Sequence, residues 1–241
     1  MQDKIAAAEG SNARKWRADD PRRLRMAEKR TSILSAARPI LLRDGLGGAT
    51  LDRVAAEGGI AKMTLYRHFP SKEALFEGLV AAMCAEMRQG IESAPSADAG
   101  QPCRERLADE LRAFTSTLIE PDALALYRLV VAEGWRLPSV ARVFDESGMR
   151  VIRLRLAALL ETGGTAAKQS WYVAGEVVAL ALGDAYQRAI LGIAQADDDE
   201  AFVQQIEVAV AHAFSNASGA PKGGGRAGSK AASKKLLRSR K

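Results

Sequence analysis

The sequence has few of the residues from which catalytic and metal sites are built. Its 241 residues include 2 histidines and 2 cysteines. Cys84 and Cys103 form no Cys-x-x-Cys pair, and the chain has no Gly-rich phosphate loop and no nucleophile elbow. We therefore expect neither an enzyme nor a bound metal or cofactor. Two isolated cysteines are typical of a reduced cytoplasmic protein rather than of a disulfide framework, and redox sensing through them is the alternative.

Long hydrophobic runs are also missing. Apolar runs such as Val177 to Leu182 are much too short to cross a bilayer. The first residues, Met1 to Lys4, show no apolar signal region. We therefore expect a cytoplasmic protein with no membrane partner.

Charge is distributed unevenly along the chain. Residues 1–72 carry 15 Lys and Arg against 8 Asp and Glu, a net +7, whereas residues 73–215 carry a net −9. Residues 216–241 add 8 cationic side chains and no acidic one. The overall net charge of +6 conceals this division. A basic end on an acidic body is expected of a protein that meets phosphates with one end only, so the charge pattern favours nucleic acid as a partner.

The most specific pattern lies in the first third of the chain. Thr50 is a good N-cap for a short amphipathic helix, which ends at a Gly58-Gly59 turn and is followed by a second short helix. Two helices that cross steeply through such a turn need a small residue at the crossing and an apolar side chain from the second helix, which Ala55 and Leu65 supply. The pattern predicts a helix-turn-helix that binds double-stranded DNA. An ordinary helical hairpin in a core is the alternative.

The second of these helices divides into two sides at about 100° per residue. Leu65 and Phe69 fall on one side and are predicted to be buried. Met63 and Arg67 project almost opposite to them. Arg67 is suited to donate two hydrogen bonds to a guanine edge, and Met63 to make an apolar contact such as one with a thymine methyl group. These two residues are therefore the predicted base-reading side chains.

Other polar residues around this helix are suited to the DNA backbone. Lys62, Tyr66 and Lys72 are predicted to contact phosphates, which fixes the register of a protein on the duplex without reading its sequence. Ser71 is predicted to cap the following helix, whose first backbone N–H groups offer a further phosphate site.

Residues 25–80 resemble the DNA-binding domain of the TetR family of bacterial regulators. The motifs that carry the resemblance are Ile33-Leu34-x-Ala36-Ala37, Asp44-Gly45, Thr50-Leu51-Asp52-Arg53-Val54-Ala55, Gly59-Ile60-Ala61-Lys62 and Thr64-Leu65-Tyr66-x-His68-Phe69-x-Ser71-Lys72-Glu73-Ala74-Leu75-Phe76. The resemblance implies a homodimer that represses, or less often activates, transcription and that leaves DNA when a small molecule binds its C-terminal domain. The family's DNA contacts fall here on Thr50, Lys62, Met63, Thr64, Tyr66, His68 and Lys72.

Three residues depart from the family pattern. Ala61 stands where the family often has serine, so the second helix lacks a side-chain cap, at a cost of about 1 kcal/mol. Met63 replaces a residue that is often glycine, which leaves the base preference open. Pro39 lies within the first helix, where it removes a backbone donor and crowds the carbonyl of Ser35, and we expect a kink there.

The fold class predicted from these patterns is all-α. We expect a three-helix helix-turn-helix domain over residues 25–72 and a larger helical effector-binding and dimerisation domain over residues 73–215, which shows no alternating strand pattern. Proline and glycine breaks place the helices of the larger domain at about 72–91, 103–118, 122–133, 139–161, 166–193 and 199–215. Residues 1–24 are expected to form a flexible basic arm and residues 216–241 a disordered basic tail.

Both basic ends leave alternatives open. The arm either contacts DNA, on the phosphates or in the minor groove, or is merely solvated. The tail either attracts DNA without reading its sequence or serves as a solubilising linker.

The last two predicted helices, about 166–193 and 199–215, are the expected seam of a homodimer. Two patterns support this expectation. The first is a broad apolar stripe on the last helix, formed by Phe202, Ile206, Ala209 and Ala213 with Val203, Val210 and Phe214. The second is a heptad-like line with small residues on the preceding helix, formed by Trp171, Gly175, Val178, Leu182, Ala185 and Ala189. A two-fold dimer presents two recognition helices to successive major grooves, so the operator should be pseudo-palindromic. The alternative is that both faces are buried within one protomer.

A small-molecule inducer requires a pocket in the larger domain, and aromatic and polar side chains there are its candidate lining. The candidates are Phe114, Tyr127, Trp135, Arg153 and Trp171. A plain core role is the simpler explanation for each of them, and the sequence does not name the inducer.

Two functions compete on this evidence. The first is a ligand-responsive repressor of the TetR type, located at the nucleoid. The second is a sequence-indifferent DNA-binding protein, nucleoid-associated or scaffolding, that acts through its basic tails. Deletion of residues 216–241 distinguishes them, because operator affinity at moderate salt survives only in the first case.

Overall fold

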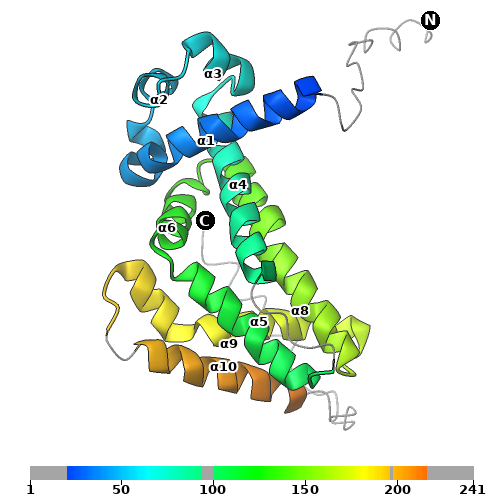
Figure 1. The fold of residues 1–241 in the computed structure, drawn as a ribbon. Coiled ribbons are helices and arrows are strands. Elements are labelled where there is room, and N and C mark those ends of the chain that lie inside the picture. The colour runs from blue at the N-terminus through cyan, green and yellow to red at the C-terminus, as the bar shows by residue number, and fades with distance from the viewer. Residues whose placement is uncertain (1–20, 94–99, 196–197, 216–241) are drawn as a thin grey trace, which may run out of the picture.

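The computed structural model describes residues 21–93, 100–195 and 198–215. The expected arm (1–24) lies almost wholly outside these residues, and the expected tail (216–241) lies wholly outside them, so their roles stay predictions. The described residues are mostly helical and contain no strand, which confirms the all-α fold class (Figure 1). Among these residues, no helix combines the length and the apolar character needed to cross a bilayer.

Three helices form the end of the molecule that is drawn uppermost in Figure 1. They are α1 (Pro21–Gly48), α2 (Leu51–Glu57) and α3 (Lys62–His68). The Thr50 hydroxyl accepts a hydrogen bond from the backbone N–H of Arg53 at 3.2 Å, so the predicted N-cap of α2 is confirmed. Ala61 precedes α3 without any side-chain cap, as predicted.

The kink expected at Pro39 was wrong in its position. α1 continues through Pro39, and its backbone departs from helical geometry at Gly45, where φ is 67°. Pro39 and Ser35 are both exposed, so the carbonyl that the proline ring crowds faces water and can tilt outward. Gly45 takes a left-handed φ at little cost because it has no Cβ.

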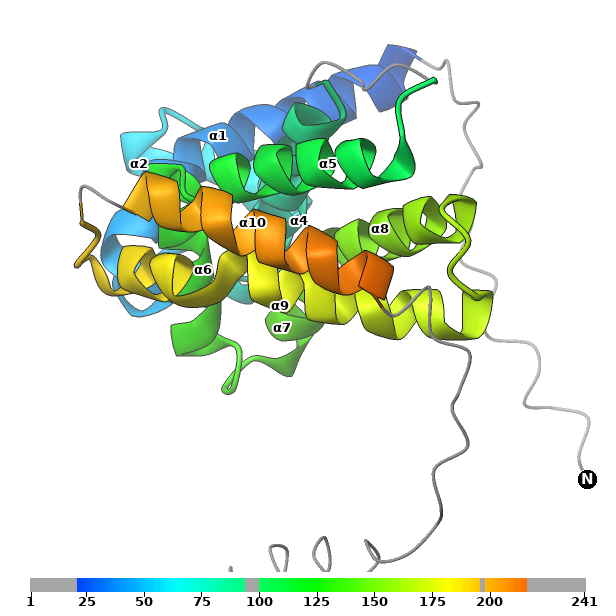
Figure 2. The same ribbon diagram turned by 90° about the horizontal axis from the view of Figure 1, so that it is seen from below.

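The remaining helices form the body. They are α4 (Lys72–Ser93), α5 (Cys103–Leu118), α6 (Pro121–Glu133), α7 (Pro138–Phe144), the π-helical turn η1 (Asp145–Met149), α8 (Arg150–Thr162), α9 (Ala167–Leu191) and α10 (Asp198–Ser215). α4 leads from the α1–α3 end into the body, and α9 and α10 lie side by side across the opposite end (Figures 1 and 2).

The single helix expected over residues 139–161 is interrupted by η1. The widened turn packs against α4: the Ser147 carbonyl accepts a hydrogen bond from Arg88 Nη1 at 3.1 Å, and a Cβ at Gly148 would lie 3.2 Å from Cys84 Sγ. π-Helical turns inside longer helices are frequent at functional sites. This turn therefore marks the part of the body where α4 meets the α7–α8 segment.

Two buried apolar clusters meet along α4. The first joins α1, α2 and α3 to α4, α6 and α7, and includes Leu65, Phe76 and Leu126. The second is built from α5, α8, α9 and α10, and the Ile91 side chain near the end of α4 belongs to it. α4 thus connects the core beneath α3 with the core of the far end of the body.

Candidate DNA-binding surface and effector pocket

The predicted division of α3 into two sides is confirmed. Leu65 and Phe69 are fully buried. Met63 is 83% exposed, and Tyr66 and Arg67 also lie on the surface. The side of α3 that faces solvent therefore carries a long apolar side chain (Met63), a guanidinium (Arg67) and a phenol (Tyr66), while Leu65 and Phe69 on the opposite side anchor the helix in the core.

The turn before α3 is held by backbone geometry. Gly59 has φ +60°, and the Ile60 N–H donates to the Ala55 carbonyl at 2.8 Å. A Cβ at Gly58 would lie 2.8 Å from Ala36 Cβ, so only glycine lets α1 and α2 approach this closely. The two glycines have separate tasks, one in the close approach and the other in the left-handed turn.

α1 also supports the far end of α3. The Arg30 guanidinium lies over the Phe69 ring, 4.2 Å from its centroid. Arg30 Nη1 donates to the His68 carbonyl at 3.3 Å. Positive charge at a helix C-terminus is favourable, so this arginine, which the sequence reasoning missed, helps to fix the angle at which α3 is presented.

An acidic residue of α2 contacts the exposed side of α3. Asp52 forms an ion pair with Lys62 Nζ at 3.0 Å and accepts a long hydrogen bond of 3.5 Å from the Tyr66 hydroxyl. Both partners were predicted to contact phosphates. All three side chains are exposed, so these contacts are weak and can be exchanged for phosphate oxygens.

The other predicted backbone contacts lie around the same helix. The Thr50 hydroxyl is engaged in the α2 cap, while Thr64 and His68 are half-buried. Lys72 Nζ donates to the Leu46 carbonyl at 3.3 Å, which ties the start of α4 to the end of α1. The Ser71 hydroxyl accepts from the backbone N–H of Ala74 at 3.1 Å, which confirms the predicted cap of α4.

Cationic neighbours influence His68. Desolvation lowers the pKa of its imidazole below 6.5, and Arg67, Arg30 and Lys29 lower this pKa further. His68 is therefore neutral near neutral pH.

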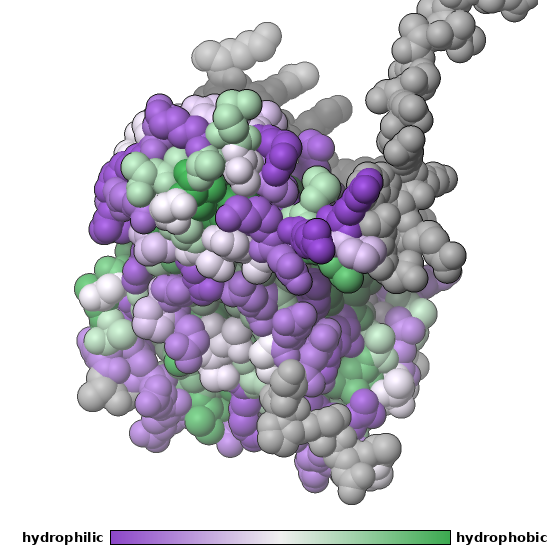
Figure 3. All heavy atoms as spheres, turned by 45° about the horizontal axis from the view of Figure 1, so that its top comes forward, coloured by the Kyte–Doolittle hydropathy of each residue, from purple (hydrophilic) through white to green (hydrophobic). Residues whose placement is uncertain are grey.

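Hydrophilic residues cover most of the visible surface when this end of the molecule is turned forward (Figure 3).

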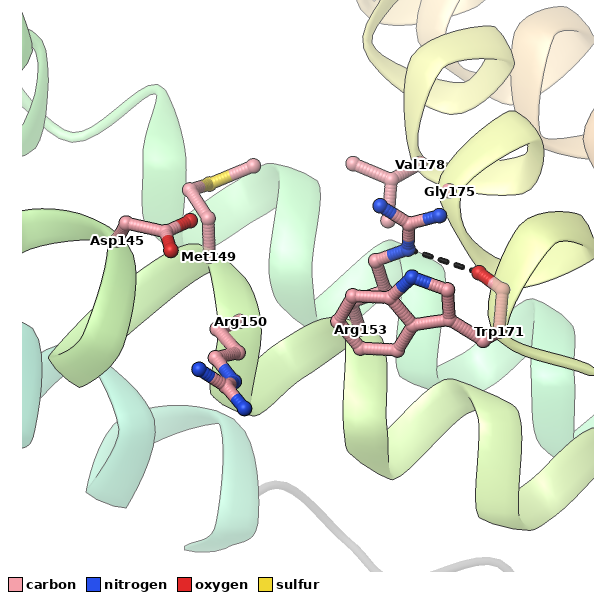
Figure 4. A pocket seen from close by; sticks show the side chains of 7 residues that line it. All are labelled: Asp145, Met149, Arg150, Arg153, Trp171, Gly175 and Val178. Atoms are coloured by element: carbon pink, nitrogen blue, oxygen red, sulfur yellow. Dashed lines mark hydrogen bonds between the residues drawn. The ribbon is translucent and has the colours of Figure 1, made fainter.

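A pocket of about 290 Å³ opens in the body between η1, α8 and α9 (Figure 4). It is lined by Asp145, Met149, Arg150, Arg153, Trp171, Gly175 and Val178. The Arg153 guanidinium lies over the Trp171 indole, 4.0 Å from its ring centroid, and its Nε donates to the Trp171 carbonyl at 2.8 Å. The pocket therefore combines an aromatic and aliphatic wall with charged side chains.

The structure does not bring the five candidate effector residues together. Arg153 and Trp171 share the large pocket, whereas Phe114 lines a separate apolar void of about 30 Å³ beside α4. The Tyr127 ring lies 5.7 Å from that of Tyr186 in a small buried cluster, and Trp135 is exposed on the surface next to Arg136.

Five residues of the large pocket were missed by the sequence reasoning, namely Asp145, Met149, Arg150, Gly175 and Val178. One signal was available for Arg150, because it precedes Arg153 by one helical turn and so lies on the same face of α8. Asp145 and Met149 carried no such signal, since their position depends on the π-helical turn.

The apolar lines assigned to the dimer seam are for the most part internal. Phe202, Ile206, Ala209 and Ala213 are buried because α10 packs against α9 and α5 of the same protomer. Trp171, Gly175 and Val178 line the pocket against α8. The four residues of α10 were wrongly assigned, because they are buried within one protomer. Trp171 and Gly175 are only half-buried, so their place in the seam stays a prediction. The outer face of the two helices carries other apolar side chains, of which Tyr172 is 65% and Val208 56% exposed.

The two cysteines are not joined in a disulfide. Cys84 is buried, and burial raises the pKa of its thiol to about 11. Cys103 Sγ donates to the Leu159 carbonyl at 3.3 Å. Because the thiolate is the form that reacts with oxidants, the burial of Cys84 argues against redox sensing through this residue.

Comparison with known proteins agrees with this architecture. The family model described as bacterial regulatory proteins of the tetR family matches residues 33–79, and that of the AefR-like transcriptional repressor C-terminal domain matches residues 105–215. The solved structure of the flavonoid-responsive regulator FrrA is 30% identical, and the alignment covers 79% of this chain and 97% of that chain with a TM-score of 0.65. The chain belongs to the TetR family of transcriptional regulators.

Two further relatives set limits on the comparison. UidR, a transcriptional regulator of Escherichia coli, is 29% identical over 126 residues, which are 51% of this chain and 60% of UidR's own length. FasR of Mycolicibacterium smegmatis, a transcriptional activator, is 29% identical over 154 residues, 57% of this chain and 68% of FasR. These TetR-family relatives are regulators and not enzymes, which confirms that expectation, and they do not favour the sequence-indifferent alternative.

A structure from Mesorhizobium loti supports the same fold at lower identity. This TetR-family protein is 21% identical, and the alignment covers 80% of this chain and 98% of that chain with a TM-score of 0.68. At that identity the likeness concerns the fold alone.

Proposed function

We propose that this TetR-family regulator is a homodimeric repressor that binds a pseudo-palindromic operator through α3 and leaves it when a small molecule enters the pocket at Arg153. The observation that carries the proposal is the exposed side of α3. Met63 and Arg67 project from a helix whose opposite side is buried, as direct readout in a major groove requires.

The contacts divide between reading and positioning. Arg67 and Met63 read base edges, because a guanidinium fits the two acceptors of guanine and a thioether fits a thymine methyl group. The positioning contacts to phosphates are assigned to Thr50, Lys62, Thr64, Tyr66, His68 and Lys72. The ion pair of Lys62 with Asp52 is exposed, so it gives way to phosphate at small cost.

Selection of bound duplexes from random DNA by the full chain tests this division. Arg67→Ala should lose about 1–3 kcal/mol of discrimination at one base pair in each half-site, whereas Lys62→Ala should weaken matched and scrambled duplexes alike. Arg104→Ala, which removes another exposed arginine, one on α5, is the control and should change neither. An unchanged base preference in Arg67→Ala would refute the reading role.

The second copy in the dimer is proposed to cover the outer face of α9 and α10. Tyr172 and Val208 expose large hydrophobic side chains there, and the small residues Ala179 and Ala211 of the same two helices are also exposed. Small side chains let helices of two protomers approach closely. The two helices lie at the end of the molecule opposite α2 and α3 (Figures 1 and 2).

The dimer is tested by Val208→Glu, with Val131→Glu as its matched control. Val131 is 59% exposed on α6, close to the 56% of Val208, so both substitutions place the same charge at the same exposure. Light scattering coupled to size exclusion should give a monomer for Val208→Glu and a dimer for Val131→Glu. A dimer in both variants contradicts the proposed face.

The pocket is proposed to act on α3 through Met149 and α4. Met149 lines both the large pocket and the apolar void, and the void is also lined by Cys84, Met87 and Ile91 of α4. A ligand that displaces Met149 therefore pushes on the helix whose first turn follows α3. FrrA is by its description flavonoid-responsive, and we propose a planar organic effector here as well.

Met149→Ala separates binding from response. The shorter side chain should leave ligand binding in the large pocket within a few-fold of the parent value while ligand no longer releases the operator. The paired measurements are calorimetric titration of ligand and fluorescence anisotropy of labelled operator. Full release by ligand in the variant would exclude this route.

A further inference from the structure

The guanidinium of Arg153 has hydrogen-bond capacity that the protein leaves unused. Its Nε donates to the Trp171 carbonyl, but within the described residues neither terminal nitrogen has a hydrogen-bond or ion-pair partner. Both nitrogens belong to a side chain that lines a pocket of about 290 Å³. A planar fork of unused donors is the geometry that binds carboxylate through two parallel hydrogen bonds.

The guanidinium is also held in place. The Trp171 ring lies on one side of it at 4.0 Å, and Gly175 of α9 lies against it so closely that a Cβ there would be 2.7 Å from the guanidinium carbon and from Nη2. Gly175 is therefore required for this close approach. The donor fork is preorganised, which lowers the entropy that a ligand must overcome on binding.

The rest of the pocket indicates what is attached to the anion. Arg150 adds a second cation, and Met149 and Val178 add apolar surface. Asp145 is the one acidic side chain in the lining, and Figure 4 places it beside Met149, away from Trp171. The volume lies near the lower end of the range of about 300–1,000 Å³ that is usual for small-molecule sites, which favours a compact ligand over a long chain.

We propose that the effector is a compact aromatic carboxylate whose carboxylate pairs with Arg153 and whose ring packs against Trp171, Met149 and Val178. This inference rests on the proposed function, since it names the ligand class of the same pocket. It makes a separate claim, however, because binding of an acid to this pocket can be measured without DNA.

The probes are 2-naphthoate and 2-naphthamide, which share shape and size and differ in charge. Calorimetric titration of the full chain should show 2-naphthoate binding at least 10-fold more tightly than 2-naphthamide. Arg153→Met should abolish this preference, because it keeps a long apolar side chain and removes the donor fork. Arg104→Gln, which removes a cation from the surface of α5, should keep it.

Gly175→Ala tests the cradle without changing any charge. The added methyl group must displace the guanidinium, which is the flexible end of a side chain, so the protein should fold while the preference for the acid falls toward that of Arg153→Met. Gly90→Ala on α4 is the matched control, since nothing lies within 4 Å of a Cβ there. Thermal unfolding of all variants verifies that they are folded.

Each outcome bears on one claim. Equal binding of acid and amide, or no binding of 2-naphthoate at millimolar concentration, overturns the anion inference and leaves the DNA-binding proposal to its own test. An acid preference that persists in Arg153→Met also overturns it. Binding of 2-naphthoate that depends on Arg153 but does not release operator supports the inference and contradicts the proposed effector response.

Discussion

The missing cap of the recognition helix makes a gain of stability predictable. Ala61 occupies the N-cap position of α3, with φ −60° and ψ 127°, and offers no side-chain acceptor. Its carbonyl already accepts from Thr64 and Leu65, at 2.8 and 3.1 Å. The first N–H groups of α3, on Lys62 and Met63, receive no intrahelical partner, as at every helix start. A hydroxyl at position 61 would supply an acceptor for one of them.

The size of the gain follows from the neighbouring helix. Thr50 caps α2 through a 3.2 Å bond to the Arg53 N–H, and such caps contribute about 1 kcal/mol. The backbone at Ala61 has a less extended φ than that of Thr50, which is −123°, so we place Ala61→Ser at the lower part of the range, about 0.5–1 kcal/mol. For a protein of this size the expected rise in Tm is roughly 1–4 °C.

Chemical and thermal unfolding of the full chain measure this effect. Thr50→Ala should lose about as much as Ala61→Ser gains, and it calibrates what a cap contributes in this protein. Ala56→Ser is the control, because it adds the same hydroxyl at an exposed position within α2, where serine costs about 0.5 kcal/mol in helix propensity. A free energy of unfolding that is unchanged or lower in Ala61→Ser, alongside a loss in Thr50→Ala, would refute the reasoning.

Three further predictions concern the same end of the molecule. Gly59→Ala should lower the free energy of unfolding by about 1–2 kcal/mol, because φ at Gly59 is +60°. Gly47→Ala is the control and should not lower it, since Gly47 has equally open surroundings but no positive φ. Equal losses in the two variants would exclude backbone strain as the cause. The pKa of His68 is lowered in the folded protein, so as pH falls below 6.5 the unfolded chain takes up this proton before the folded chain does, and the stability associated with neutral His68 is lost. His68→Gln should therefore flatten the fall of Tm between about pH 7 and 5.5. A Tm–pH profile identical to that of the parent protein contradicts the lowered pKa. Asp52→Asn should tighten binding to matched and scrambled duplexes alike, since it releases Lys62 and removes a negative charge beside the phosphates. Anisotropy titrations measure this affinity. No gain in affinity would show that the Asp52–Lys62 ion pair does not compete with DNA.

Local signals were sufficient for most helix boundaries and for the side of α3 that is exposed. Pro121 and Pro138 stand at the first positions of α6 and α7, where a proline needs no hydrogen-bond partner, and the Thr50 cap fixed the start of α2. The positions of Leu65 and Phe69 follow from helical periodicity alone. Such features depend on residues a few positions apart, so the sequence specifies them directly.

Features that depend on packing between distant helices were not predictable in this way. The breadth of the apolar stripe on α10 indicated burial, but Ile206 is covered by α9 and α5 of the same protomer and not by a partner. The pocket arises where α8 meets α9, so Arg153 and Gly175 come together through tertiary packing that no local pattern encodes. The low helix propensity of proline predicted a kink at Pro39. That side of α1 is exposed, so the Ser35 carbonyl that the proline ring crowds can tilt toward water and the helix continues.

The central claim is that the exposed side of α3 reads base pairs. Its most direct test is a competition measurement at about 150 mM salt, in which the full chain is bound to a selected inverted repeat and displaced by the same repeat or by a scrambled duplex. We predict that the matched competitor is effective at a concentration at least about 10³-fold lower, and that Arg67→Ala narrows this ratio. Equal displacement by both duplexes would contradict the account.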